Sequence, residues 1–546
     1  MYVDSATIKR GSKTYRRRLL RTSFRENGKV RHKTLLNLSN CTNEEVNALE
    51  LALKHKGNLE SLTSLDDFES KQGKRVGAVW TLNTIARRLG VTKALGTNRQ
   101  AKLALLQVIA RIIYQGSRLS AVRLAMSHAL CEIIGIDTLN ENDLYENLAW
   151  LAKHQESIEK KLFKNRFPNQ VPTLFLYDVT SSYLEGTENE MASFGYNRDG
   201  KKGKKQIVIG LLAGPDGLPV AVRVFKGNTN DTKTVSEQIR ILAKSFGVKE
   251  ITFVGDRGML KGSQIENLPD DFRYITAITK PQIATMLSEE IVQMELFSEQ
   301  VCEVESQGIR YVLRRNPLRA QQMAESRRSK VVAISTLVEK QNTYLAEHPK
   351  ANAKKSLEKI AAKIQRLKAS AWLNAIEELR KITLIRDEQA LSQASLLDGC
   401  YIIKSDVSKD CADTQTLHDR YCDLEKVERT FRTMKTVHLD LRPVFVKKEV
   451  STKGHVFAVM LAIILQRELE QCWRNLDITV EEGIDELGAI CAHEFRLGKI
   501  TINDIPKPRK RVAELLKSAS VVLPLKLPTY TPSVHTTKRL NSKKIL

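Results

Sequence analysis

Two aspartates, Asp178 and Asp256, each come directly after a short apolar segment, LFLY before Asp178 and FVG before Asp256. Short apolar runs of this kind predict buried strands. A carboxylate at the end of a buried strand is unfavourable unless a cation lies close to it. If the two strands are neighbours, the carboxylates lie together and offer the oxygen ligands that Mg²⁺ prefers. The pattern therefore predicts a divalent-metal site.

A glutamate on a helix supplies the third carboxylate of the predicted site. The chain from Tyr421 to about Leu439 has the pattern of one long helix, with Glu428 in its middle. Tyr421, Arg432 and Lys435 lie on the same helical face as Glu428. Such a set suits a phosphodiester, because cations and a hydroxyl can bind its oxygens beside the metal. The predicted catalytic and metal-binding residues are Asp178, Asp256 and Glu428, and the predicted phosphate-binding residues are Tyr421, Arg432 and Lys435.

Each of these acids also has an ordinary explanation when it is taken alone. An Asp at a strand end often caps a turn, as Asp256 could before Arg257. A single Glu such as Glu428 is common on a helix surface. A surface helix would not, however, place an aromatic residue in line with the charged ones. The combination favours a site for two Mg²⁺ ions, for which Mn²⁺ can substitute and which clamp the oxygens of an in-line displacement.

The charge of the chain points to a polyanionic partner. The 546 residues include 87 Lys and Arg against 63 Asp and Glu, a formal net charge of +24. Such an excess is typical of proteins that bind nucleic acid, although some basic proteins are merely soluble. The hydrophobic content of 42% is ordinary for a folded protein.

Neither the cysteines nor the apolar segments indicate an exported or membrane protein. The eight cysteines form no C-x-x-C pair, which argues against a zinc finger or a disulfide framework. The start of the chain has no apolar segment of the signal-peptide type. The longest apolar run, from Val456 to Leu465, is about half of what a bilayer span requires. We expect a cytoplasmic, nucleoid-associated protein of a prokaryote with no membrane partner.

The elements that must position the site alternate between strands and helices. Apolar segments predict strands at 174–177, 206–212, 219–225, 251–255, 272–279 and 400–404. Asn27-Gly28 predicts a tight turn between basic strands at 15–24 and 29–35. The domains that we predict are 1–75, a basic β-hairpin and linker that could contact DNA; 76–167, a helical N-terminal domain that could bind DNA ends; 168–285, the first part of an α/β catalytic domain; 286–395, a helical insertion; 396–475, the rest of the catalytic domain; and 476–546, a basic C-terminal tail.

A set of motifs carries a resemblance to a known family. They are YDVTSSY (177–183), GYNRDG (195–200), VFKGNTND (224–231), VGDRGM (254–259), the helix of Tyr421, Glu428, Arg432 and Lys435, then RPV (442–444) and GH (454–455). The chain resembles the DDE transposases of bacterial insertion sequences in the IS-four superfamily, nearest its IS-sixteen-thirty-four branch. The signature helix of that superfamily has an Arg where this chain has Leu424, a phosphate contact that Arg432 could supply instead.

The resemblance implies an RNase H-like mixed sheet with flanking helices, with the insertion before the catalytic Glu. It also implies cut-and-paste transposition. Water cuts one strand at each element end, and the freed 3′-hydroxyl proceeds through a hairpin on the transposon end to target DNA. The implied partners are double-stranded DNA, as terminal inverted repeats and as target, and a second copy of the chain. Two alternatives remain: a nuclease on the same fold that does not join DNA, and a DNA-binding derivative that has lost catalysis.

Overall fold

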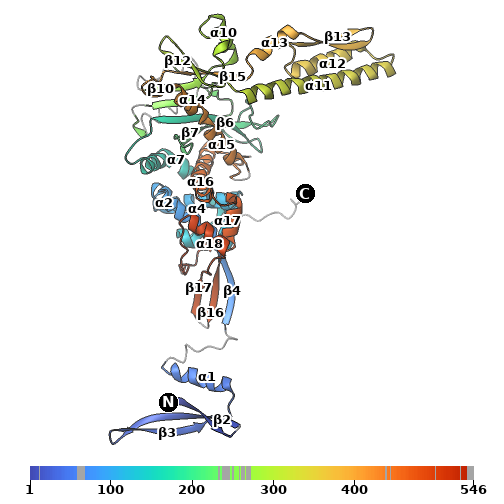
Figure 1. Ribbon diagram of the computed structural model, residues 1–546. Helices are drawn as coiled ribbons and strands as arrows, with labels where there is room; N and C mark the ends of the chain where they lie inside the picture. The colour runs from blue at the N-terminus through green and yellow to red at the C-terminus, as the bar shows by residue number, and fades with distance from the viewer. Residues whose placement is uncertain are drawn as a thin grey trace. The chain divides into compact units, whose positions relative to one another are not determined.

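The computed structural model consists of two compact units (Figure 1). The first comprises Met1–Arg75, Ile490–Pro508 and Leu523–Thr529, and the second comprises Val76–Ala489, Arg509–Val522 and Tyr530–Leu546. The structure describes residues 1–11, 13–57, 68–231, 234–235, 241, 246–248, 251–257, 259, 265, 272–436, 439–442, 444–497, 500–528 and 530–537.

The first unit begins with an antiparallel sheet of β1 (Tyr2–Arg10), β2 (Lys13–Glu26) and β3 (Lys29–Asn37). The predicted hairpin is β2–β3. Its turn residues Asn27 and Gly28 have φ of 50° and 76°, the left-handed backbone that this two-residue turn needs. β1 is an additional strand that the turn signals do not predict. The unit also holds α1 (Asn43–Lys54) and a second sheet in the order β17 (Ile500–Asp504), β16 (Cys491–Leu497), β4 (Phe68–Arg75).

The second unit begins with the helices that the sequence predicts between residues 76 and 167. α4 and α7 contact α16 (Glu449–Trp473), and Gly454 lies where α16 meets α7. A Cβ at Gly454 would lie 1.9 Å from the carbonyl oxygen of Leu148, so only glycine fits there. Because these helices share a compact unit with the large sheet, a separate helical N-terminal domain is not confirmed. The helices are α2 (Gly77–Arg88), α3 (Val91–Leu95), α4 (Arg99–Ile113), α5 (Arg118–Ser127), α6 (Leu130–Ile134) and α7 (Glu141–Arg166).

An eight-stranded mixed sheet forms the centre of the second unit. Its order is β11-β12-β15-β10-β9-β6-β7-β8. β6, β7 and β8 are antiparallel, whereas β6, β9 and β10 are parallel, which is the arrangement of an RNase H-like sheet and confirms the predicted fold class. The core between the sheet and α7 includes Phe175, Phe253 and Phe163. The strands are β6 (Leu174–Tyr183), β7 (Gln206–Ala213), β8 (Pro219–Lys226), β9 (Ile251–Gly255), β10 (Phe272–Ala277), β11 (Cys302–Ser306), β12 (Ile309–Arg315) and β15 (Cys400–Ser405).

The predicted helical insertion at 286–395 contains strands as well as helices. A helical hairpin of α11 (Pro317–Glu347) and α12 (Ala353–Arg366) is present (Figure 1). β11 and β12, however, extend the central sheet beyond β15, and β13 (Leu373–Glu378) pairs with β14 (Lys381–Arg386). The insertion thus holds the predicted helical hairpin and, in addition, short strands that lack a long apolar run. The remaining elements are α10 (Lys280–Ser288), η4 (Met294–Leu296) and α13 (Glu388–Leu396).

Where the structure describes it, the region after residue 475 is folded, which differs from the basic C-terminal tail that the sequence predicts. α17 (Val480–Gly488) contacts α2 and α16, and α18 (Lys510–Ser518) contacts α17. β18 (Ser533–Val534) pairs with β5 (Thr138–Leu139). One hydrogen bond that holds α18 against α16 comes from Trp473, whose indole N–H donates to the Leu515 carbonyl at 3.1 Å. The basic residues that suggested a tail alternate with apolar ones that are buried on α18.

Candidate active site

The two predicted aspartates are neighbours in the central sheet. β6 and β9 run parallel, and Tyr177 pairs with Gly255, so that Asp178 and Asp256 are the next residues of adjacent strands. Asp256 follows the end of β9, as predicted. Asp178 does not end its strand: β6 continues to Tyr183 because β7 pairs with it along its whole second half. The strand that ends beside Asp178 is β9, the parallel neighbour of β6.

Glu428 joins the two aspartates from a helix that contacts β6. α15 (Leu424–Lys435) carries Glu428 and buries Val427, Phe431 and Met434. A cavity of about 480 Å³ lies between this helix and the sheet. Its lining includes Asp178, Asp256, Glu428, Tyr421, Arg257 and Leu424. The structure thus brings the three predicted acids to one pocket.

The electrostatics of the pocket show that the three acids interact. Burial raises the pKa of Asp178 to about 7, and the negative charges of Asp256 and Glu428 add to the rise. A hydrogen bond from the Val179 N–H, at 2.7 Å, and the charge of Arg198 act in the opposite direction. Like charges held together in a partly buried site favour a proton or a cation between them.

The donor set of the pocket fits a divalent metal ion, although its side chains are not arranged in a preformed coordination site. All three groups are carboxylates, the ligands of a hard cation such as Mg²⁺. Within the described residues, no three His, Cys, Asp or Glu side chains stand in position to hold an ion as they are. Asp256 and Glu428 are exposed, so their side chains can turn towards an ion that enters the pocket.

The predicted long helix at 421–439 is two helices. α14 (Thr414–Cys422) ends before Asp423, and α15 begins at Leu424. Tyr421 therefore does not share a continuous helical face with Glu428, which corrects the prediction. The Tyr421 hydroxyl still lies in the pocket, 3.4 Å from Asp256 Oδ1, and burial together with Asp256 raises the pKa of Tyr421.

The two predicted phosphate-binding cations lie outside the lining of this pocket. Lys435 binds Asp199 through Nζ–Oδ1 at 2.9 Å, and Arg442 binds the same oxygen at 2.5 Å. Arg432 is exposed on α15. Asp199 belongs to the GYNRDG loop, so Lys435 ties that loop to the helix that carries Glu428. Phosphate binding by Lys435 and Arg432 stays a prediction.

A cation that the spacing argument missed lies in the pocket. Arg257 follows Asp256 directly and lines the pocket together with Tyr421 and Leu424, the residue at the position of the missing signature Arg. Its charge counteracts the rise in the pKa of Tyr421. The signal in the sequence was its place beside Asp256 in the motif VGDRGM. That motif indicated the acid but not the role of its neighbour.

Comparisons with known proteins give the family of the chain. Residues 169–465, more than half of the chain, match the family model "Transposase DDE domain". Residues 4–72 match the model "IS1634 family transposase, N-terminal domain". No curated protein matches the chain. Among solved structures, a cryo-EM structure of the piggyBac transposase synaptic complex with hairpin DNA matches 75% of this chain and 75% of its own, with 9% identity and a TM-score of 0.36.

The sheet, the three acids and the family model define the class: the chain belongs to the DDE transposase family, enzymes that act on DNA. The match of its first residues shows that it is a DDE transposase of the IS1634 type. No helix in the described part of the chain is long and apolar enough to cross a membrane.

Proposed function

We propose that this transposase cuts DNA at the ends of its element and transfers each freed 3′-hydroxyl into target DNA. The observation that carries the proposal is the pocket that Asp178, Asp256 and Glu428 line together, in which the other two carboxylates add to the raised pKa of Asp178. Asp178, Asp256 and Glu428 would hold two Mg²⁺ ions. Bound ions of this kind polarise the scissile phosphate and lower the pKa of the attacking oxygen.

The chain's own residues would position the DNA in this pocket. The guanidinium of Arg257 would bind a non-bridging oxygen of the terminal phosphate, as a charge-assisted hydrogen bond. Burial and Asp256 raise the pKa of Tyr421, so its hydroxyl stays protonated. It can therefore donate a hydrogen bond to a phosphate oxygen. Because the pKa of Asp178 is about 7, its carboxyl is protonated in part near neutral pH, and that proton must leave when a cation enters.

We also propose that two copies of the chain act together on double-stranded DNA, each bound to one terminal inverted repeat. Joining requires that both element ends reach the same target, and a pair of identical subunits meets this need with one binding mode. The net charge of +24 supports extensive contact with DNA phosphates.

Asp178→Asn tests the catalytic assignment. The variant keeps the shape of the side chain but loses the charge that holds a cation, so nicking of a duplex with the element end should be lost while binding is retained. Asp485→Asn, at an exposed position on α17, is the matched control and should nick at the wild-type rate. Nicking by Asp178→Asn at the wild-type rate would refute the assignment.

A second assay separates a transposase from a nuclease on the same fold. A duplex that already has a free 3′-hydroxyl at the element end is incubated with the protein, Mg²⁺ and a supercoiled target. Covalent joining of the end to the target is expected. Nicking of uncut ends without any joining of pre-cut ends would show that the chain only hydrolyses DNA.

A further inference from the structure

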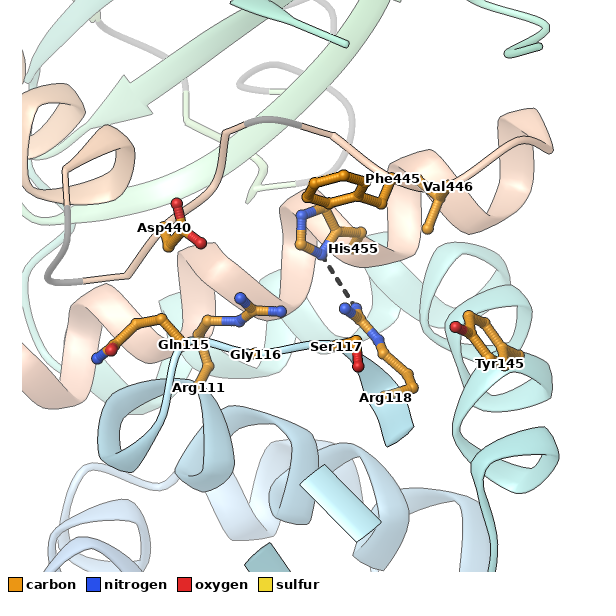
Figure 2. A pocket seen from close by; sticks show the side chains of 10 residues that line it. All are labelled: Arg111, Gln115, Gly116, Ser117, Arg118, Tyr145, Asp440, Phe445, Val446 and His455. Carbon is orange, nitrogen blue, oxygen red and sulfur yellow. Dashed lines mark hydrogen bonds between the residues drawn. The ribbon is translucent and has the colours of Figure 1, made fainter. Parts of the chain in front are cut away.

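A second cavity lies in the same unit as the acidic pocket and shares no lining residue with it. It has a volume of about 320 Å³. Figure 2 shows Arg111, Arg118 and His455 around its interior, with Phe445 and Tyr145 also on its lining. The three basic side chains are at most 9% exposed, whereas Phe445 is 72% and Tyr145 39% exposed. The cavity therefore has a buried basic interior and an accessible aromatic edge.

Hydrogen bonds fix one of the two arginines in the cavity. Arg118 donates through Nε to Gln107 Oε1 at 3.0 Å. It also donates through Nη2 to His455 Nδ1 at 3.0 Å (Figure 2). Burial and the two arginines lower the pKa of His455 well below its usual value, so its ring is neutral and can accept this bond. Its other nitrogen lies 3.5 Å from the Leu441 carbonyl oxygen. Arg118 is thus held by neutral groups.

The cavity holds more positive than negative charge. Asp440 is the carboxylate in its lining, and it interacts electrostatically with Arg111. Burial lowers the pKa of Arg111 to about 10 and that of Arg118 to about 9, so both stay protonated at neutral pH. Arg111 also repels Arg118. Two guanidinium groups against one carboxylate leave an excess cation in a poorly solvated place, which an anion would offset.

The start of α5 adds to the attraction for an anion. Ser117 is the N-cap of this ten-residue helix and lines the cavity next to Arg118. Its hydroxyl already accepts the Ser120 N–H at 3.2 Å. The positive end of the helix dipole is therefore directed to the same place as the two arginines.

The cavity is also connected to the network beside the acidic pocket. Asp440, which lines the cavity, and Arg442, which binds Asp199, are two residues apart in the segment between α15 and α16. An anion bound between Arg111 and Arg118 would thus lie beside Asp440, two residues from the Arg442 that binds Asp199 of the GYNRDG loop. This proximity favours an anion that belongs to the DNA substrate over an unrelated metabolite.

We propose that this cavity binds one phosphate of the DNA backbone at a distance from the cutting site. A phosphodiester carries a single negative charge, which equals the excess of the cavity. Arg111 and Arg118 bind its oxygens, and the exposed rings of Tyr145 and Phe445 contact the adjoining sugar or base. The inference rests on the proposed function in so far as the ligand is the DNA of the element.

Ethylation interference tests the proposal directly. Phosphates of a duplex with the element's terminal inverted repeat are ethylated, and binding is measured in EDTA, so that no cutting occurs. Ethylation of one particular phosphate should weaken binding by the wild-type chain. Ethylation of the same phosphate should not weaken binding by the Arg111→Gln chain. Binding by Arg111→Gln should be about tenfold weaker, in line with a charged hydrogen bond. The slope of its log binding constant against log salt concentration should decrease in magnitude by the amount expected for about one phosphate contact.

Arg123→Gln is the matched control. Arg123 is exposed on α5 and does not line the cavity, so its loss removes the same charge from the surface alone. Its interference pattern should equal that of the wild type. If the pattern of Arg111→Gln also equals that of the wild type, the proposal is overturned. Thermal unfolding of each variant without DNA establishes that it is folded.

Inorganic phosphate distinguishes the two sources of the same chemistry. Stabilisation of the wild-type chain by phosphate but not by chloride, with an interference pattern that Arg111→Gln leaves unchanged, would assign the cavity to free phosphate and overturn the assignment to DNA. Asp178→Asn separates this proposal from the catalytic one. If that variant keeps both nicking and the Arg111-dependent phosphate contact, the catalytic assignment fails and the cavity assignment stands.

Discussion

The Nζ atom of Lys435 lies 2.9 Å from Oδ1 of Asp199, and only 9% and 1% of these side chains are exposed. Asp199 also accepts the backbone N–H of Tyr183 at 3.0 Å and the guanidinium of Arg442. One buried carboxylate therefore joins β6, the GYNRDG loop, the end of α15 and the segment after it. The signature lysine therefore has a structural partner within the chain.

Asp199→Asn should destabilise the fold strongly. The substitution leaves Lys435 and Arg442 without their shared counter-charge in a buried place, which costs roughly 3 kcal/mol of unfolding free energy. Asp231→Asn breaks the more exposed pair with Arg198 and should cost less than about 1 kcal/mol. Urea unfolding measures both. In the double variant Asp199→Asn with Lys435→Gln, part of the lost stability should return, and equal losses for Asp199→Asn and Asp231→Asn would contradict the prediction.

The metal-free chain should lose stability as the pH rises from about 4 to about 7. The pKa of Asp178 is about 7 in the folded chain, above the value of roughly 3.9 of an unfolded Asp. Between these values the folded chain binds the proton more tightly, so the slope of stability against pH is negative there and flat above. Unfolding in EDTA at several pH values checks this. Asp178→Asn should remove this contribution, and an unchanged difference between variant and wild type across this range would oppose the assignment.

Binding of a divalent ion should release a proton below pH 7. The ion needs Asp178 ionised, and the raised pKa keeps that carboxyl protonated in part. Calorimetry of Mg²⁺ or Mn²⁺ binding in two buffers of different ionisation enthalpy measures the protons released. The release should be close to one proton at pH 6 and close to none at pH 9. The same release at both values would mean that another group supplies the proton.

Local patterns predicted the strands of the site well and its helix poorly. β9 and the position of Asp256 follow from a short apolar run between polar residues, which is information contained in the segment itself. The break at Asp423 has no Pro or Gly to announce it. It places Tyr421 against Asp256 while Glu428 remains at the pocket, a consequence of tertiary packing.

The extended strand β6 and the strands in the insertion have the same kind of explanation. Asp178 interrupts the apolar run, so the run alone predicts a strand end, yet β7 supplies hydrogen-bond partners as far as Tyr183. β11 and β12 are short, and they form because β12 pairs with the side of β15 that does not face β10, after which β11 pairs with β12. Sheet partners that are distant in the sequence cannot be identified from a local window.

Arg257→Ala should lower the rate of nicking by about tenfold or more. The change removes the cation that lines the pocket beside Tyr421, and a charged hydrogen bond to phosphate contributes about 1.5–3 kcal/mol. Adding Leu424→Arg to the Arg257→Ala variant restores the signature residue at the same pocket and should recover part of the rate that Arg257→Ala loses. Single-turnover nicking of an element end measures both. Full activity of Arg257→Ala would show that the phosphate is held by another residue, such as Arg432.

Trp372→Ala should loosen the insertion without stopping the chemistry. Trp372 is 5% exposed and lies in a hydrophobic cluster with Ile360 and Ile364, whose residues do not line the acidic pocket. Loss of a buried Trp costs about 3–5 kcal/mol, so protease cleavage within α11 and α12 should rise. Leu379→Ala, at a fully exposed position, is the control for this measurement. Nicking of an element end by Trp372→Ala should stay near the wild-type rate because the carboxylates are held by the central sheet and α15. If nicking and joining were both lost in a variant that still binds the element end, the insertion would be part of the catalytic assembly.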